Sequence, residues 1–179
     1  LNLFGLVAIF SLDRGQGLTA YPFLKKQLIA VAIGIFLVAI TMRIQYTLFR
    51  SVSTVLYITS LVLLVGVLIF GHTIRGTRGW FVLGGFSFQP VEFAKVALII
   101  HLAHFFARYR DHFRTWWSLV GSGIIVLIPV TLVLAQPDAG SALLMVATWI
   151  VMLLVAGVRR VHVTVFIIVS IIFVIIAWI

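Results

Sequence analysis

Tyr46 to Phe70 reads YTLFRSVSTVLYITSLVLLVGVLIF, an apolar run that a single charged residue, Arg50, interrupts. A helix needs about 20 mainly apolar residues to cross the hydrocarbon core of a bilayer. Backbone N–H and C=O groups find no water there, so a continuous run of this length must form a helix. Strands of a membrane barrel are shorter and alternate between apolar and polar residues, and this run does neither. The run therefore predicts a membrane-spanning helix.

Further apolar runs lie on both sides of this helix. We predict spanning segments at Leu1–Leu12, Phe23–Met42, Val91–Ala107, Trp116–Ala135, Ala142–Gly157 and Val163–Ile179. The chain begins with Leu1 rather than Met and ends inside an apolar run, so we expect a piece of a longer protein. Together the runs predict an all-α, polytopic transmembrane helix bundle of about seven segments. We expect it to form a single transmembrane domain, residues 1–179, truncated at both ends.

Composition places the chain in the membrane class. Hydrophobic residues make up 63% of it and charged residues 9%, against roughly 45–50% and about 25% in soluble domains. The formal net charge is +9, but the basic residues sit mostly in short connections, where they direct topology and contact anionic headgroups. We find no nucleic-acid motif, so we expect membrane lipids and no nucleic acid as partners. The sequence has no cysteine, which excludes disulfides and thiolate metal sites.

The distribution of lysine and arginine predicts an orientation. Alternate connections form two sets, and the positive-inside rule places the more basic set in the cytoplasm. The more basic set holds Arg43, Arg50, Arg108, Arg110, Arg114, Arg159 and Arg160, and the other holds Arg14, Lys25, Lys26, Arg75 and Arg78. Under this orientation the connections Gly71–Pro90 and Gln136–Ser141 both face outward.

Glu92 and Lys95 form a charged pair at the start of a predicted helix. Glu92 follows Pro90, which suits a first helical turn, and an acid there interacts favourably with the helix dipole. Lys95 comes three residues later and therefore shares a helix face with Glu92. One interpretation is a salt bridge that holds two helices together. The other is a charged pair that lines a polar cavity, because charges in spanning helices usually face a bundle interior or a water-filled path.

The turn Gln136-Pro137-Asp138-Ala139-Gly140-Ser141 contains a second acid of interest. Pro137 ends the preceding helix and Asp138 is placed to cap the next one, which is reason enough for an aspartate here. The predicted orientation puts this turn on the same side as Glu92 and Lys95. Two acids and a lysine near the outer face would form one polar site, able to bind a headgroup or to position a proton-transfer group.

The long outer connection adds Arg78 and Trp80. Trp80 suits an interfacial anchor, since indole prefers the headgroup level of a bilayer. The guanidinium of Arg78 matches phosphate oxygens and is a candidate for binding a phosphate. His101 and His104 have a spacing that would suit a metal on one helix, but no third ligand follows at a recognised spacing, so we expect no metal site.

Two blocks of sequence resemble the SEDS family of membrane proteins, which includes RodA, FtsW and SpoVE. The first block is similar to the family signature around an outer loop and reads Arg75-Gly-Thr-Arg78-Gly-Trp80, Leu83-Gly-Gly and Phe88-Gln89-Pro90-Val91-Glu92-Phe93-Ala94-Lys95. The second is similar to the family's Gln-Pro-Asp-Leu-Gly-Thr-Ala and reads Gln136-Pro137-Asp138-Ala139-Gly140-Ser141-Ala142. The family usually has Ser, Leu and Thr where Val91, Ala139 and Ser141 stand. The resemblance implies the first seven or so helices of a ten-helix fold.

The resemblance also implies an activity. SEDS proteins are peptidoglycan glycosyltransferases that polymerise lipid II, an undecaprenyl-pyrophosphate-linked disaccharide-peptide, at the outer face of the bacterial cytoplasmic membrane during cell elongation or division. A class B penicillin-binding protein is the implied partner. The family's proposed catalytic Asp would lie beyond Ile179, so no catalytic residue is assigned and the fragment alone is expected to be inactive. The candidate cavity and substrate-binding residues are Glu92, Lys95, Asp138, Gln136, Arg78 and Trp80.

Transfer between lipid-linked sugars requires deprotonation of an acceptor hydroxyl and stabilisation of a pyrophosphate leaving group. An acid performs the first task. A lysine, an arginine or a divalent cation such as Mg²⁺ or Mn²⁺ performs the second, and we expect no other cofactor. The alternative function is a flippase for a lipid-linked precursor, because a polar intramembrane pair in a helix bundle is also typical of transporters.

Overall fold

The computed structural model describes residues 22–74, 76–83, 86–109 and 116–158, together with Gly5, Phe10, Ser11, Val161 and Thr164. Two compact units divide the chain, Leu1–Leu48 and Phe49–Ile179, and each is described by itself. The first unit contains the helix α2, Pro22–Thr41. The second contains most of α3, Tyr46–Phe70, followed by β1 His72–Ile74, β2 Thr77–Leu83, β3 Phe86–Phe88, α4 Pro90–Arg108, α5 Trp116–Leu134 and α6 Ala139–Val155.

The helices in the described residues confirm the helical bundle expected from the apolar runs. α3 begins and ends at the predicted residues, and α2, α4 and α5 differ from the prediction by at most one residue at either end. α2 from Leu24, α3 and α4 are each long and apolar enough to cross a membrane. The predicted segments Leu1–Leu12 and Val163–Ile179 lie almost wholly outside the described residues.

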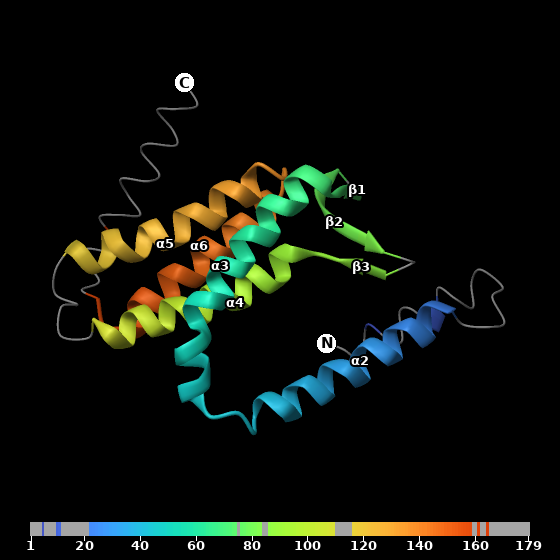
Figure 1. Ribbon diagram of the computed structural model, residues 1–179, viewed down its shortest axis with the longest axis horizontal. Coiled ribbons are helices and arrows are strands. Elements are labelled where there is room, and N and C mark those ends of the chain that lie inside the picture. The colour runs from blue at the N-terminus through green and yellow to red at the C-terminus, as the bar shows by residue number, and fades with distance from the viewer. Residues whose placement is uncertain are drawn as a thin grey trace. The chain divides into compact units, whose positions relative to one another are not determined.

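The connection between α3 and α4 contains a small sheet that the sequence analysis did not predict. The strands follow the order β1-β2-β3, and both pairings are antiparallel. Ile74 pairs with Thr77, and Leu83 pairs with Phe86. Aromatic and β-branched residues favour a pleated backbone, and this stretch is rich in both. Figure 1 shows the sheet at the end of the bundle where α3 ends and α4 begins.

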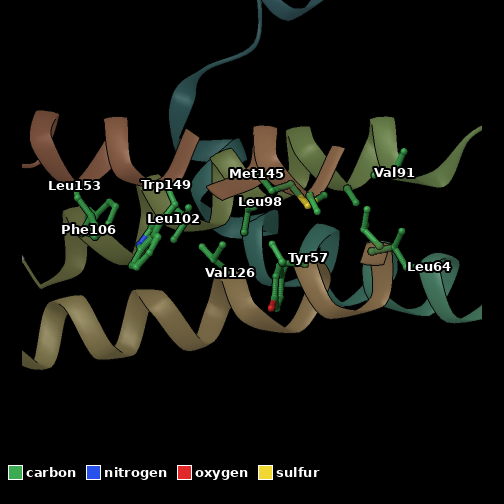
Figure 2. Close-up of a cluster of buried hydrophobic side chains, with 14 of the residues drawn as sticks. Tyr57, Leu64, Val91, Leu98, Leu102, Phe106, Val126, Met145, Trp149 and Leu153 are labelled. Atoms are coloured by element: carbon green, nitrogen blue, oxygen red, sulfur yellow. The ribbon is translucent and has the colours of Figure 1, made fainter. Parts of the chain in front are cut away.

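The core of the second unit lies between α3, α4, α5 and α6. α4, α5 and α6 pack against one another in all three combinations. Figure 2 shows buried side chains of the four helices converging between them. Leu64 of α3, Leu98 and Leu102 of α4, and Met145 and Leu153 of α6 are each almost fully buried. This shared core fixes the ends of the four helices relative to one another.

Polar side chains add specific contacts between these apolar helices. The Tyr57 hydroxyl donates a hydrogen bond of 2.8 Å to the Ile125 carbonyl and so joins α3 to α5. Trp149 Nε1 donates to Ser122 Oγ at 2.9 Å and joins α6 to α5. Hydrogen bonds of this kind fix which faces of transmembrane helices meet, since lipid competes with apolar packing alone.

Candidate functional site

A polar cleft of about 680 Å³ opens at one end of the second unit. This is the end at which α3 and α5 finish and at which α4 and α6 begin. The cleft is lined by Ile74, Thr77, Trp80, Ser87, Gln89, Glu92, Lys95, Asp138, Gly140, Ser141 and Leu144. Three stretches of sequence therefore contribute to it: the sheet, the first turns of α4 and the start of α6.

Glu92 and Lys95 occupy the wall that α4 contributes. Gln89 is the N-cap of this helix and Pro90 follows at its first position, so Glu92 falls in the first turn, as expected from the proline. Lys95 Nζ lies 2.8 Å from Glu92 Oε1. The pair joins successive turns of one helix rather than two helices. Both side chains line the cleft, which is the position that the cavity interpretation requires.

Asp138 both caps α6 and lines the cleft. Its Oδ1 accepts a hydrogen bond of 3.0 Å from the backbone N–H of Ser141, which confirms the expected N-cap of α6. The cap explains why α6 begins at Ala139 rather than at the predicted Ala142. Asp138 also lines the cleft, together with residues of the sheet and of α4. Capping and a position in the site are therefore compatible.

Trp80 belongs to β2, where it pairs with His72 of β1. It lines the cleft together with Thr77, from the same strand. The indole therefore has a place in the wall of the polar site. An interfacial anchor and a substrate-binding residue both remain predictions for Trp80.

Arg78 lies one residue before Gly79 on the same strand but has different contacts. Its Nε donates to the Gly71 carbonyl at 3.3 Å and its Nη2 donates to the Ile69 carbonyl at 3.1 Å. Ile69 lies in the last turn of α3 and Gly71 directly follows the helix, where backbone acceptors have no partner within the helix. Arg78 is not among the described residues that line the cleft. Its binding of a phosphate stays a prediction, and Arg75 lies outside the described residues.

Gln136 lies behind the cleft rather than in its lining. Its side chain is almost fully buried, and Nε2 donates to the Leu64 carbonyl of α3 at 3.3 Å. Gln136 precedes Asp138 by two residues, so it follows α5 and comes just before the cap of α6. Gln136 thus connects α3 to the turn before α6, and its binding of substrate stays a prediction.

Several lining residues were not predicted from the sequence, chiefly Thr77 and Ser87 of the sheet and Gly140 and Ser141 of α6. The sequence does contain a pattern that predicts the sheet. Gly84-Gly85 separates two short runs rich in aromatic residues, a pattern typical of a hairpin. Recognising it would have predicted that residues on both sides of the glycines lie close together.

The histidines at 101 and 104 are not among the lining residues. The His101 ring stacks on the Tyr57 ring with a centroid distance of 4.6 Å, and the His101 and His104 rings are 6.5 Å apart. Across the described part of the chain, no three His, Cys, Asp or Glu side chains gather as a metal site would require.

Comparison with known proteins gives matches along the whole chain. The family model for the cell cycle proteins FtsW, RodA and SpoVE matches residues 1–179. A protein of Trichlorobacter lovleyi named "Probable peptidoglycan glycosyltransferase FtsW" is 36% identical over 174 residues, which cover 91% of this chain and 45% of that protein. Stage V sporulation protein E of Bacillus subtilis is 36% identical, covering 80% of this chain and 40% of the relative. Peptidoglycan glycosyltransferase RodA of Treponema pallidum is 31% identical, covering 74% and 30%.

Solved structures match as well. A chain from a peptidoglycan synthase complex has a TM-score of 0.76 and 32% identity, covering 97% of this chain and 52% of its own length. RodA of Thermus thermophilus has a TM-score of 0.72 and 29% identity, covering 96% and 58%. These matches confirm the multi-helix transmembrane fold. The chain spans less than half the length of the curated relatives named above.

Proposed function

The chain belongs to the cell cycle protein family of FtsW, RodA and SpoVE, and on that premise we propose that the full-length protein is a peptidoglycan glycosyltransferase. FtsW of T. lovleyi and RodA of T. pallidum carry names that state this activity. One observation of this chain supports the proposal above the others. Side chains from both blocks of family-like sequence line one cleft, with Trp80, Glu92 and Lys95 from the first and Asp138 from the second.

The proposed substrate is lipid II, which joins a sugar and peptide headgroup to a long polyprenyl chain. A multi-pass membrane protein with a polar cleft at one end of its helices suits such a molecule, because the headgroup and the chain need different surroundings. With the orientation that the positive-inside rule predicts, the cleft would open at the outer face of the membrane, which in this proposal is the bacterial cytoplasmic membrane. Elongation and division are both compatible with this placement.

The charges in the cleft suit glycosyl transfer. The Lys95 ammonium would stabilise negative charge on the pyrophosphate leaving group, as a fixed cation does for developing charge in other sites. The carboxylates of Glu92 and Asp138 would orient the acceptor sugar and hold Lys95 in place. The resemblance puts the base that deprotonates the acceptor hydroxyl on an Asp beyond Ile179. The residues described here would then support that base rather than replace it.

A divalent cation is a separate question. Within the described residues the ligands for a protein-held Mg²⁺ or Mn²⁺ do not gather, and Glu92 is already paired with Lys95. These residues do not fit such a site, and no step is assigned to a metal. In the proposal, Mg²⁺ or Mn²⁺ would be present as the counter-ion of the pyrophosphate of the substrate.

A class B penicillin-binding protein is the proposed protein partner. The support is the likeness to a chain from a peptidoglycan synthase complex that coordinates polymerization and crosslinking. Such a complex couples the growth of a glycan strand to a second, crosslinking activity.

Polymerisation of lipid II by the full-length protein in detergent or nanodiscs tests the proposal. Glycan chains should form with the partner present, and Lys95→Met should abolish them while the protein stays folded. A wild-type protein that forms no glycan with the partner present would contradict the proposal. The alternative of a flippase predicts transfer of lipid II across a proteoliposome membrane without partner or polymer, and a parallel flipping assay distinguishes the two functions.

A further inference from the structure

Gln136 joins parts of the second unit that are far apart in the sequence. Its amide lies 72 residues from its hydrogen-bond partner, the Leu64 carbonyl of α3. Its exposed fraction is 1%, and it is one of the largest fully buried side chains in the described residues. An amide that loses its partner in an apolar interior costs roughly 1–3 kcal/mol. The position of Gln136 relative to α3 is therefore strongly favoured over alternatives.

The other end of the same amide faces the sheet. A Cβ added to Gly79 of β2 would lie 3.2 Å from Gln136 Oε1. This separation is tighter than ordinary van der Waals contact, so with a residue larger than glycine the amide or the strand would have to give way by a few tenths of an ångström. Glycine at position 79 is what allows β2 to approach Gln136 so closely. Gln136 therefore bonds to α3 through its nitrogen, while its oxygen faces Gly79 of β2 with little room between them.

These contacts lie next to both walls of the cleft. Gly79 precedes Trp80, and Gln136 precedes Asp138 by two residues. Trp80 and Asp138 line the cleft from β2 and from the start of α6. A side chain that sets the separation between Gly79 and residue 136 thus also sets the separation between the sheet wall and the α6 wall.

We propose that Gln136 is a positioning residue for the cleft, which acts by holding the Trp80 strand and the Asp138 cap at a fixed separation. It is not among the residues that line the cleft, and its proposed role is to place those that are. The link to catalysis rests on the proposed glycosyl transfer, whereas the structural claim stands without it. Misplacing groups in an active site by about 1 Å lowers a rate by as much as about 100-fold.

A distance measurement tests the structural claim. The 179-residue sequence has no cysteine, so spin labels can be placed at Val82→Cys on β2 and Leu143→Cys on α6 of the full-length protein, with any cysteine elsewhere replaced. Both sites are exposed and neither lines the cleft. Gln136→Met keeps the volume of the side chain but removes the hydrogen bond to the Leu64 carbonyl and the amide oxygen that faces Gly79, and it should broaden the distribution of label distances.

Tyr57→Phe is the matched control for this measurement. It removes another side-chain hydrogen bond from a helix of the same bundle to a distant backbone carbonyl, that of Ile125. It should lower Tm by an amount similar to Gln136→Met but leave the label distances sharp and polymerisation near the wild-type rate. Gln136→Met should lower polymerisation by about 10- to 100-fold.

Gly79→Ala provides a second variant in case Gln136→Met fails to fold. It adds a methyl group against Gln136 Oε1 without removing a hydrogen-bonding group, and it should shift the same label distances. The two substitutions should be less than additive, because residues in contact share one effect.

The outcomes separate the two claims. Sharp, wild-type label distances in Gln136→Met, or in Gly79→Ala where Gln136→Met does not fold, would overturn the positioning role. A broadened distribution in Gln136→Met with Tyr57→Phe unchanged would support it. A wild-type protein that makes no glycan would overturn the proposed function, while the label distances would still decide the role of Gln136.

Discussion

Lys95 Nζ lies 2.8 Å from Glu92 Oε1, and the lysine side chain is 23% exposed where that of the glutamate is 62% exposed. An ion pair this accessible contributes about 0–1 kcal/mol to stability. We therefore expect Glu92→Gln and Lys95→Met to leave Tm almost unchanged but to lower lipid II polymerisation sharply. Exchanging the two residues restores an ion pair on α4, and it should restore no activity. If both single variants polymerise normally, the charged pair has no role in the cleft.

Asp138 offers a way to separate capping from chemistry. Asparagine caps a helix about as well as aspartate, whereas alanine costs about 0.5–2 kcal/mol. Asp138→Asn should keep the hydrogen bond to the Ser141 N–H and should have a Tm near that of the wild type, yet lose most polymerisation. Asp138→Ala should lose both. Full activity in the asparagine variant would mean that the residue serves only as a cap.

Gly71 follows the last residue of α3. A Cβ at this position would overlap the Val67 carbonyl oxygen, to which the Gly71 N–H donates. Backbone cannot move aside as easily as a side-chain tip, so Gly71→Ala should lower the free energy of unfolding by about 1–3 kcal/mol. Gly66→Ala in the same helix is the control, because the added Cβ meets Phe81 at an ordinary 3.6 Å and alanine favours a helix by about 1 kcal/mol. Equal stability of the two variants, measured by thermal unfolding, would contradict the expected overlap.

Trp149 and Ser122 provide a test of helix packing that does not involve the cleft. Trp149→Phe removes the 2.9 Å hydrogen bond from the indole to Ser122 Oγ and should cost about 1 kcal/mol. Ser122 Oγ retains its own bond to the Ser118 carbonyl. In a Ser122→Ala background the same substitution should cost less, since its hydrogen-bond partner is already absent. A double-mutant cycle of unfolding free energies with no coupling would show that this bond does not stabilise the bundle.

The helices could be predicted because a long apolar run in a bilayer can satisfy its backbone hydrogen bonds only as a helix. Tyr46–Phe70 could be assigned to the residue from hydropathy alone. The sheet was not assigned, because its strands are short and its stabilisation comes from pairing between residues that hydropathy treats separately. The start of α6 was placed late for a related reason: Asp138 was identified as a cap, but Ala139 and Gly140 do not continue an apolar run.

The sequence indicated which charged residues belong to the candidate site, but not which side chains line the cleft. Glu92 and Asp138 could be selected because the chain has only four acidic residues, and Lys95 because it lies three residues after Glu92 on the same helix face. Arg78 was added because a guanidinium matches phosphate oxygens, and Gln136 because it belongs to the same family-like block as Asp138. Whether a side chain faces the cleft, a helix end or a neighbouring strand depends on packing between distant segments, and the sequence near each residue does not contain that information.

The composition of the cleft has a consequence for biogenesis. Trp80 is synthesised with β2, before α4 and α5, whereas Asp138 is synthesised after them, just before α6. A nascent chain inserted as far as α5 therefore has the aromatic and charged walls without the aspartate wall. This part of the site forms only when α6 packs against α4 and α5, so the docking of the last described helix also sets the shape of the cleft.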